Sequence, residues 1–463
     1  MGRKGEKNSE YLARRELTEI IENPVSHLHF VGVGGVSVYS LAALKLTEGV
    51  TVSGSDRQPS ERTERLSALG ARIDIGHSPE NVDGASLVVY SQAISPDNPE
   101  LKSAAEQGIP AISRAEYLGI IMRKYAVRIG VSGSHGKSTV TAMLDAIFTA
   151  AELCPTVLSG AELPSGEPFK IGSTDHLIYE ACEYRDSFLS FLPTVSLGLN
   201  LELDHTDYFA DLDGIKASFI KALGRAKDKA IINYDDENLR SILPKIKAPT
   251  VTFGQKEGSL YRYEITSFSE GGFEFSLKKH GSVVGIFRLN LPGVFNVANA
   301  ASAATVALEC GIKTEIIQMA LADFGGIGRR LELIGRRWGR DIYYDYAHHP
   351  TEISAAITAL KALKGEPITV VFRPHTYTRT RDLWSGLAQS LSLSDYLILG
   401  DIFPAREEPI PDITSKRLAA EIPGAMYCAE SEIIRAIHLL TRGTVVLMGA
   451  GDLDKVKKEI LNE

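Results

Sequence analysis

A glycine-rich turn that ends in a lysine constrains the fold of this chain more than any other segment. The turn follows a short apolar run, residues 126–130, that we expect to form a strand, and it precedes an apolar helical face over residues 140–148. At such a junction the backbone N–H groups and the positive end of the helix dipole face an anion. We therefore expect a nucleotide triphosphate to bind at Gly133, Ser134, His135, Gly136, Lys137, Ser138 and Thr139.

The lysine and the serine of this turn indicate how it would bind ATP. Lys137 can reach the terminal phosphates, and the Ser138 hydroxyl can bind Mg²⁺. The generic phosphate loop has a glycine five residues before Gly136, where this chain has Val131, so the loop is a shortened variant that starts at Gly133. The alternative is a turn that only joins a strand to a helix, but Gly-Lys-Ser at this junction is a specific signal.

Composition limits the class of protein. The 463 residues are enough for about three domains. The formal net charge of −8 disfavours a protein that binds nucleic acid or anionic membranes. The four cysteines lack metal-binding spacing, and the sequence has neither a leader-like apolar region nor a run of 18 apolar residues. We expect a cytoplasmic protein that binds neither membranes nor nucleic acid.

The first part of the chain is predicted to be Rossmann-like. A strand at residues 27–31 leads into a turn that contains Gly34 and Gly35, and the next strand ends in Asp56. The third glycine of the dinucleotide pattern is Ser37 here, so the pattern is weak evidence for NAD. We interpret the turn as a site for some nucleotide diphosphate.

Polar clusters follow the predicted strands of the middle part. Glu180, Glu183 and His205 come after apolar strands, at the sheet edge where open α/β sheets bind ligands. These residues are candidates for metal binding or catalysis, because Mg²⁺ on ATP needs carboxylate ligands; the alternative is that they are solvated loop residues. Asn296 and Asn299 are three residues apart and share a face of a predicted later helix, with helix capping as the alternative role.

The remaining patterns complete the predicted architecture. Residues 258–290 alternate polar and apolar, which indicates antiparallel ribbons attached to the central sheet. Beyond a glycine cluster with Arg329 and Arg330, apolar strands again end in polar clusters, which predicts a second doubly wound sheet. We expect an α/β protein of three domains: a Rossmann-like domain at 1–123, a central ATPase domain with a mixed sheet at 124–327, and a Rossmann-like domain at 328–463.

Seven motifs in one order carry a family resemblance over nearly the whole chain. They are HFVGVGG (29–35), SGSD (53–56), GSHGKST (133–139), NLELDH (200–205), FNVAN (295–299), DYAHHPTE (345–352) and PHTYTRTRD (374–382). With these motifs the chain resembles the Mur ligases, ATP-dependent enzymes of cell-wall precursor assembly. The last motif is similar to that of the members that add L-alanine.

The resemblance implies a reaction and its participants. ATP with Mg²⁺ would activate the carboxylate of UDP-N-acetylmuramate as an acyl phosphate, and the amine of L-alanine would displace phosphate, giving a peptidoglycan precursor. The first domain would bind the UDP-sugar, the second ATP and the third the amino acid. We expect a monomer or a homodimer.

The resemblance also implies a role for individual residues. The implied catalytic residues are Lys137, His205, Asp345 and His348. The implied metal ligands are Ser138, Glu180 or Glu183, and His205. Besides the phosphate loop, ATP would contact Asn296, Asn299 and Arg330. The UDP-sugar would contact Gly34, Gly35 and Asp56, and the third domain would contribute His375, Arg379 and Arg381.

Several positions depart from the family pattern and keep other hypotheses open. Cys182 and Arg185 stand where the family has acids, and Gly328 stands where it has a lysine. One alternative is a Mur-type ligase with another amino acid or acceptor. Another is a nucleotide-binding regulatory protein without ligase chemistry, and an NAD dehydrogenase would leave the phosphate loop unexplained.

Overall fold

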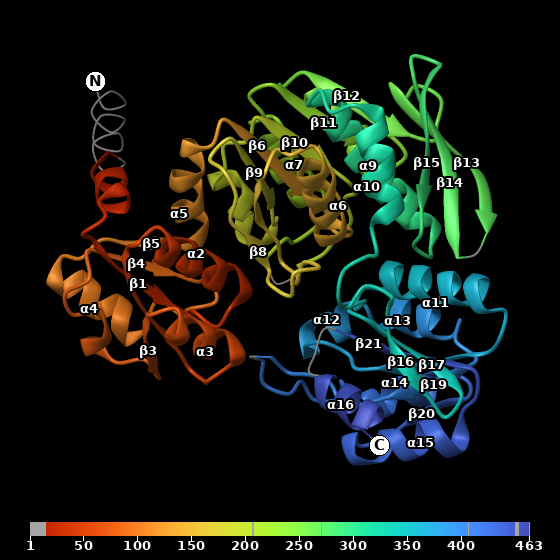
Figure 1. The fold of residues 1–463 in the computed structure, drawn as a ribbon. Helices are drawn as coiled ribbons and strands as arrows, with labels where there is room; N and C mark the ends of the chain where they lie inside the picture. Colours follow the sequence, from red (N-terminus) through yellow and green to blue (C-terminus); the bar gives the residue numbers. More distant parts are fainter. Residues whose placement is uncertain (1–14, 206–207, 270, 406, 450–452, 463) are drawn as a thin grey trace.

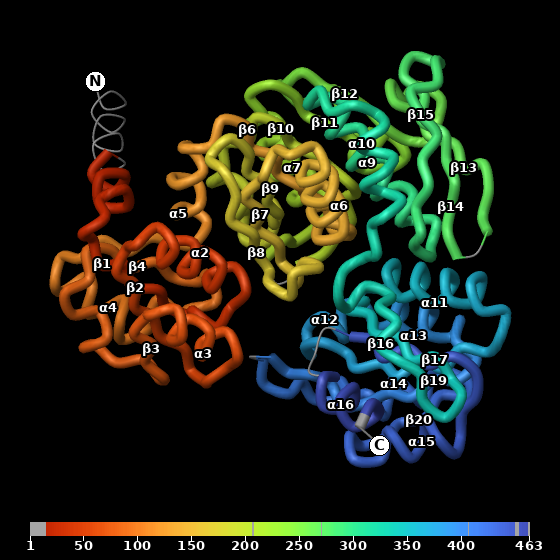
Figure 2. The backbone as a smooth tube through the Cα atoms, in the orientation of Figure 1, coloured from red at the N-terminus to blue at the C-terminus, as the bar shows by residue number. Residues whose placement is uncertain are grey.

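Three β-sheets follow one another along the chain. The computed structural model describes residues 15–205, 208–269, 271–405, 407–449 and 453–462. Figure 1 shows the first unit at the left, the central unit at the top and the third unit at the lower right, and Figure 2 follows the chain through them. The predicted three-part α/β architecture is confirmed, whereas boundaries after residues 123 and 327 remain a prediction.

The first sheet is parallel throughout, in the order β3-β2-β1-β4-β5. Its strands are β1 (His27–Val31), β2 (Thr51–Asp56), β3 (Arg72–Ile75), β4 (Leu87–Tyr90) and β5 (Ala111–Ser113). Its helices are α2 (Val36–Thr47), α3 (Glu61–Ala68), α4 (Pro99–Gln107) and α5 (Arg114–Ile121), with 3₁₀ turns η1 (Pro79–Val82) and η2 (Met122–Lys124). The glycine turn after β1 lies at the switch point between β2 and β4, where such sheets bind ligands.

The central sheet has ten strands in the order β15-β14-β13-β12-β11-β10-β6-β9-β7-β8. They are β6 (Val127–Ser132), β7 (Thr156–Leu158), β8 (Phe169–Lys170), β9 (His176–Glu180), β10 (Val195–Gly198), β11 (Lys229–Asn233), β12 (Thr250–Gly254), β13 (Tyr261–Ser269), β14 (Gly272–Lys279) and β15 (Ser282–Leu289). Its helices are α6 (Lys137–Ala150), α7 (Leu212–Leu223), α8 (Glu237–Ile242), α9 (Val294–Glu309) and α10 (Thr314–Asp323), with η3 (Tyr184–Ser190) and η4 (Leu243–Lys245).

Strand β6 lies between β10 and β9, parallel to both, so the turn at its carboxyl end is central in the sheet. The chain from β13 to β15 forms the predicted antiparallel ribbon, joined to β12. Its alternating side chains suit a sheet with one buried face, and Phe275 and Phe287 stack on that face with ring centroids 5.4 Å apart. The mixed character predicted for this sheet is therefore confirmed.

The third sheet has the order β16-β17-β21-β18-β19-β20. Its strands are β16 (Glu332–Arg337), β17 (Arg340–Asp345), β18 (Ile368–Phe372), β19 (Tyr396–Leu399), β20 (Ala425–Tyr427) and β21 (Thr444–Met448). Its helices are α11 (Pro350–Lys364), α12 (Tyr377–Asp382), α13 (Trp384–Leu391), α14 (Ser415–Glu421), α15 (Ile433–Leu440) and α16 (Asp454–Asn462), with η5 (Glu430–Glu432). The sheet is parallel apart from the antiparallel edge strand β16.

One apolar core runs from the first unit into the central unit, because α5 packs on η3. The approach requires Gly119, since a Cβ there would lie 2.2 Å from the carbonyl oxygen of Ser190. Gln92 of the first unit adds polar contacts: its carbonyl oxygen accepts from Arg185 at 2.9 Å, and its Oε1 accepts from Ser187 at 3.1 Å. Among the described residues, no helix combines the length and apolarity needed to cross a membrane.

Candidate active site

The phosphate-loop turn is shaped by two glycines and one asparagine. Gly133 and Gly136 have φ values of 150° and 83°, and a Cβ at Gly136 would lie 2.7 Å from Oδ1 of Asn299. Asn200, just after β10, accepts from the backbone N–H of His135 at 2.8 Å and donates to its carbonyl oxygen at 3.1 Å. The turn is therefore fixed before any ligand arrives, and Lys137 starts α6 directly behind it.

Lys137 points at a buried carboxylate. Its Nζ lies 3.1 Å from both carboxylate oxygens of Glu183, whose side chain is only 1% exposed. Burial alone would lower the pKa of Lys137, but Glu183 and the other acidic groups nearby together outweigh burial and raise the pKa above its ordinary value. The ammonium group is therefore charged and neutralises a carboxylate that is shielded from water.

The two glutamates of the predicted metal cluster have different surroundings. Glu183 also faces His205, with 3.7 Å between its Oε1 and the imidazole Nε2. Glu180 instead accepts hydrogen bonds from the Ser159 hydroxyl, at 3.1 Å, and from the backbone N–H of Gly160. The structure thus brings Lys137, Glu183 and His205 together and directs Glu180 to a neighbouring loop.

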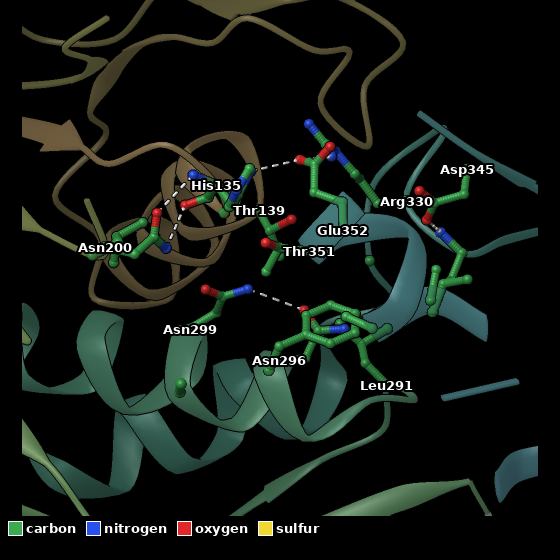
Figure 3. A pocket seen from close by; sticks show the side chains of 18 of the residues that line it. His135, Thr139, Asn200, Leu291, Asn296, Asn299, Arg330, Asp345, Thr351 and Glu352 are labelled. Carbon is green, nitrogen blue, oxygen red and sulfur yellow. Dashed lines mark hydrogen bonds and ion pairs between the residues drawn. The ribbon is translucent and has the colours of Figure 1, made fainter. Parts of the chain in front are cut away.

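A cavity of about 270 Å³ lies beside the turn, between the central and third units (Figure 3). Of the predicted residues, its lining includes His135, Gly136, Thr139, Asn296, Asn299, Arg330 and Asp345. Asn299 donates to Oδ1 of Asn296 at 3.2 Å, so the two amides share a face of α9, as expected. Asn296 also donates to the carbonyl oxygen of Pro292, at 2.8 Å, which fixes its orientation at the cavity wall.

A network of charged residues crosses from the phosphate loop to the third unit. His135 lies between two carboxylates, with Nε2 3.3 Å from Glu202 and Nδ1 3.1 Å from Glu352. Burial alone would lower the pKa of His135, but hydrogen bonds to these carboxylates outweigh burial and raise it to about 9. Arg330 extends the network, 3.5 Å from Glu352.

Asp345 and His348 lie at the carboxyl end of β17, beside this network. Asp345 accepts from the backbone N–H groups of Leu331 and Ala347, both at 2.7 Å, and burial raises its pKa to about 6. Burial lowers the pKa of His348 to about 4, so its imidazole is neutral near pH 7. Its Nδ1 lies 3.1 Å from the carbonyl oxygen of Tyr346.

The two predicted arginines of the third unit, Arg379 and Arg381, make different contacts. Arg379 bridges the two units: one guanidinium nitrogen lies 3.0 Å from Nδ1 of His375 and another lies 3.1 Å from Asp204 of the central unit. Burial would raise the pKa of Asp204, but the charges of Arg379 and neighbouring groups together outweigh burial and lower that pKa. Arg381 is 52% exposed and pairs with its neighbour Asp382 at 2.8 Å. Of these two arginines, Arg379 is the one that contacts the central unit.

In the first unit, the acid that ends β2 holds the glycine turn. Asp56 accepts from the backbone N–H of Gly34 at 2.9 Å, and Gly35 is the N-cap of α2. Arg62 donates to the carbonyl oxygen of Gly34 at 3.2 Å. The predicted residues therefore share one edge of the sheet, and a cationic side chain lies next to them.

Sequence reasoning missed four polar residues of this site. Asn200, Glu202, His349 and Glu352 were quoted in motifs without an assigned role, because nothing local distinguishes them from capping residues. Glu352 does accept from the backbone N–H of His349, at 3.4 Å, at the start of α11. Arg329, the neighbour of Arg330, pairs with Asp454 at 2.6 Å.

Comparisons with known proteins were made at the level of family, sequence and structure. Three family models match in succession: "Mur ligase family, catalytic domain" at 27–126, "Mur ligase middle domain" at 131–307 and "Mur ligase, glutamate ligase domain" at 329–451. The UDP-N-acetylmuramate–L-alanine ligase of Alkaliphilus metalliredigens is 39% identical over 452 residues, 96% of this chain and 98% of the relative. The chain belongs to the Mur ligase family. The resemblance seen in the motifs is confirmed.

Further relatives of this Mur ligase extend the comparison. The enzyme of the same name from Caldicellulosiruptor bescii is 38% identical, covering 94% of this chain and 98% of the relative. The solved UDP-N-acetylmuramate–alanine ligase of Thermotoga maritima has a TM-score of 0.81 at 24% identity, covering 94% of this chain and 98% of that one. A murein peptide ligase from Psychrobacter arcticus has a TM-score of 0.71 at 22% identity, with the same coverage. These two structures support the fold.

Proposed function

We propose that this Mur ligase uses ATP to join L-alanine to the carboxylate of UDP-N-acetylmuramate, in cytoplasmic synthesis of peptidoglycan precursors. One observation carries the proposal: the phosphate-loop turn opens into a cavity that residues of the third unit also line. A phosphoryl group bound there would lie at the contact between the central unit, which binds ATP, and the third unit, which would bind the amino acid. Relatives that share about 38% identity with nearly the whole chain bear the name of this activity.

The cavity fits a nucleotide. Its lining combines apolar side chains with amide groups, among them Leu291, Phe295, Asn296 and Asn299, which suits a flat base and a ribose. At the other end lie the phosphate-loop turn and Arg330. A guanidinium group there suits phosphate, which it can bind with two parallel hydrogen bonds.

Lys137 and Glu183 would work as a pair in phosphoryl transfer. The ammonium group that neutralises Glu183 here would move to the terminal phosphate, where it offsets the charge that develops during transfer. The carboxylate left behind and the buried Ser138 hydroxyl are oxygen ligands, which Mg²⁺ prefers. When bound, Mg²⁺ would supply further charge neutralisation on the phosphates. We assign Glu183, with Ser138, as a metal ligand ahead of Glu180, and His205 as a residue that orients Glu183.

The UDP-sugar would reach the terminal phosphate of ATP from the first unit, and L-alanine would reach it from the third unit. The UDP moiety would bind at Gly34, Gly35 and Asp56, placing the sugar carboxylate toward the central unit. Arg379 and His375 would bind the L-alanine carboxylate. A carboxylate oxygen attacks the terminal phosphorus and ADP leaves; the amine then attacks the acyl carbon, loses a proton and expels phosphate. Asp345 lines the cavity, and His348 follows it closely in the chain. These two residues are our further catalytic candidates.

Arg185, one of the departures from the family pattern, does not require another substrate. Arg185 donates to the carbonyl oxygen of Gln92 and stacks on Tyr184, with 5.4 Å from its guanidinium carbon to the ring centroid. It therefore contributes to the contact between the first and central units. We propose a monomer or a homodimer, with domain boundaries after residues 123 and 327.

Phosphate release tests the function directly. The full chain is mixed with ATP and Mg²⁺, with or without UDP-N-acetylmuramate and each member of a panel of amino acids, and the product is identified by mass. We expect phosphate and an amide product only when both the UDP-sugar and L-alanine are present. Preference for another amino acid or acceptor would contradict the assignment, and ATP binding without turnover under every condition would indicate a regulatory protein.

A further inference from the structure

Three potential metal ligands converge between the phosphate loop and the third unit. His135 belongs to the loop, Glu202 follows β10, and His349 is the N-cap of α11. One ligand atom from each residue lies within 4.8 Å of the other two. Oε2 of Glu202 is 3.3 Å from Nε2 of His135 and 3.4 Å from Nδ1 of His349. The three side chains thus meet around one point although they come from distant segments.

The spacing and chemistry of these atoms suit a transition metal. Bonds of about 2.0 Å in a tetrahedral zinc site place neighbouring ligand atoms about 3.3 Å apart, and both distances to Glu202 are close to that value. Two imidazole nitrogens and one carboxylate oxygen are also the ligand set of zinc sites that keep a fourth position open. Mg²⁺ prefers oxygen ligands, so this cluster and the Glu183 cluster differ in the metal that they suit.

Two of the three ligands, His135 and Glu202, have a supporting contact of the kind seen around protein metals. Nδ1 of His135 lies 3.1 Å from Oε1 of Glu352, which leaves Nε2 directed toward Glu202. A carboxylate on the far nitrogen of a histidine orients the ring and strengthens it as a ligand. The Thr351 hydroxyl donates to Oε2 of Glu202 at 2.8 Å and fixes that carboxylate. The ligand atoms are therefore oriented before a metal binds.

His349 provides an independent indication. Its Nδ1 accepts from the backbone N–H of Thr351 at 3.4 Å, so this nitrogen carries a lone pair. The same nitrogen lies 3.4 Å from Oε2 of Glu202, another acceptor. Two acceptors that face each other repel unless a cation lies between them. A divalent ion bound to both atoms would remove that repulsion.

We propose that His135, Glu202 and His349 form a site for a divalent transition metal, of which Zn²⁺ is the probe ion. The metal would link the phosphate loop to α11 at the cavity that we assign to the nucleotide, and its open position would face that cavity. Binding releases the proton of His135 to solvent. The site itself depends only on the three side chains, so it can be tested apart from ligase activity.

Metal binding to the full chain without nucleotide tests the proposal. The protein is stripped with a chelator, returned to excess Mg²⁺ to fill magnesium sites, and titrated with Zn²⁺ against a chromophoric chelator. We expect one Zn²⁺ per chain in the wild type, and loss of that site in His349→Ala and in Glu202→Gln. Glu352→Gln removes only a supporting contact, so the expected fall in affinity is about 10–100-fold.

Two control variants separate the proposed site from other histidines. His280→Ala alters an exposed turn and should bind Zn²⁺ like the wild type. His205→Ala alters the Glu183 cluster and should also retain the site. Circular dichroism checks that each variant is folded, and a second ligand variant remains informative if one fails. The proposal is wrong if the wild type binds no Zn²⁺ in Mg²⁺, if both ligand variants bind normally, or if His205→Ala abolishes binding.

Discussion

Lys137 forms a buried ion pair with Glu183, and we expect it to contact phosphate during the reaction. The structure holds the ammonium group against a carboxylate that is almost fully shielded from water. Such a pair contributes little net stability, but removal of one partner leaves a buried charge uncompensated. The Lys137 ammonium group is therefore available to bind phosphate, and until then both it and the Glu183 carboxylate are paired.

Replacement of Lys137 should affect both activity and stability. We expect Lys137→Met to lower phosphate release by at least about 10²–10³-fold, as for loss of a group that stabilises a transition state. The unpaired Glu183 should also destabilise the protein by about 3 kcal/mol. Thermal unfolding of Lys137→Met and of Lys137→Met/Glu183→Gln measures the second effect. The double variant should regain stability but not activity, and equal melting temperatures for the two would refute the pairing argument.

Arg379 is expected to determine the affinity for the amino acid. Because its guanidinium group is already held by His375 and Asp204, Arg379→Gln should raise the KM for L-alanine about tenfold or more and leave the KM for ATP nearly unchanged. Loss of one charge-assisted hydrogen bond accounts for an effect of about 1.5–3 kcal/mol. Arg417→Gln, at an exposed arginine of α14, is the matched control. An equal rise in both KM values would show that Arg379 only supports the fold.

At the scale of elements, helix α9 illustrates how the cavity wall is anchored. Asn296 and Asn299 lie near its first turn, and Glu309 at its last turn is held by three side chains of the sheet. Lys229, Tyr261 and Lys279 contact Glu309 at 2.6, 2.7 and 3.0 Å. The acidic end of the helix is thereby tied to β11, β13 and β14.

This anchor predicts a defined acid sensitivity. Burial would raise the pKa of Glu309, but the hydrogen bonds from its partners outweigh burial and lower the pKa to about 2. Since the folded-state pKa lies below the ordinary value of 4.5, the stabilisation is complete above about pH 4.5 and is lost as the pH falls toward 2. We expect Glu309→Gln to melt at a lower temperature than the wild type near neutrality, with the difference shrinking below pH 4.5. A difference that stayed constant with pH would contradict this assignment.

Helix α5 and η3 form the element contact that places the first unit. Because a Cβ at Gly119 would meet the Ser190 carbonyl oxygen, we expect Gly119→Ala to cost about 1–3 kcal/mol and to lower activity by displacing the UDP-sugar site. Gly214→Ala in α7 is the control, since its Cβ would make only an ordinary contact, 3.5 Å from Asp211. Alanine in the first turn of this helix should be neutral or stabilising. Similar melting curves for both variants would show that the contact can relax.

The sequence predicts the helices and strands better than it predicts the side-chain contacts between them. Local patterns identified β6 as a short apolar run, α6 by its apolar face and the antiparallel ribbon by its alternation. They missed β16, whose sequence Glu-Leu-Ile-Gly-Arg-Arg is paired at a sheet edge and lacks a buried face. They also could not tell Glu183 from Glu180, or Arg379 from Arg381. Those distinctions depend on Lys137 and Asp204, residues brought near by tertiary packing from other elements.

At the scale of the whole molecule, the central and third units share a cavity at the phosphate-loop turn. The first unit is joined to the central unit by a continuous apolar core, whereas the third unit meets the central unit through charged pairs such as Asp204–Arg379 and His135–Glu352. Interfaces of the second kind allow relative motion more readily than apolar ones. We therefore expect the third unit to be the one that moves as substrates bind and products leave.

The central claim is that the phosphate loop delivers a phosphoryl group to the sugar carboxylate before the amine attacks. Oxygen-18 in that carboxylate of UDP-N-acetylmuramate tests it, with the released phosphate analysed by mass spectrometry after a single turnover with ATP and L-alanine. An acyl phosphate transfers one carboxylate oxygen to phosphate, so we predict one labelled oxygen in each phosphate released. Unlabelled phosphate, formed together with the amide product, would contradict the account.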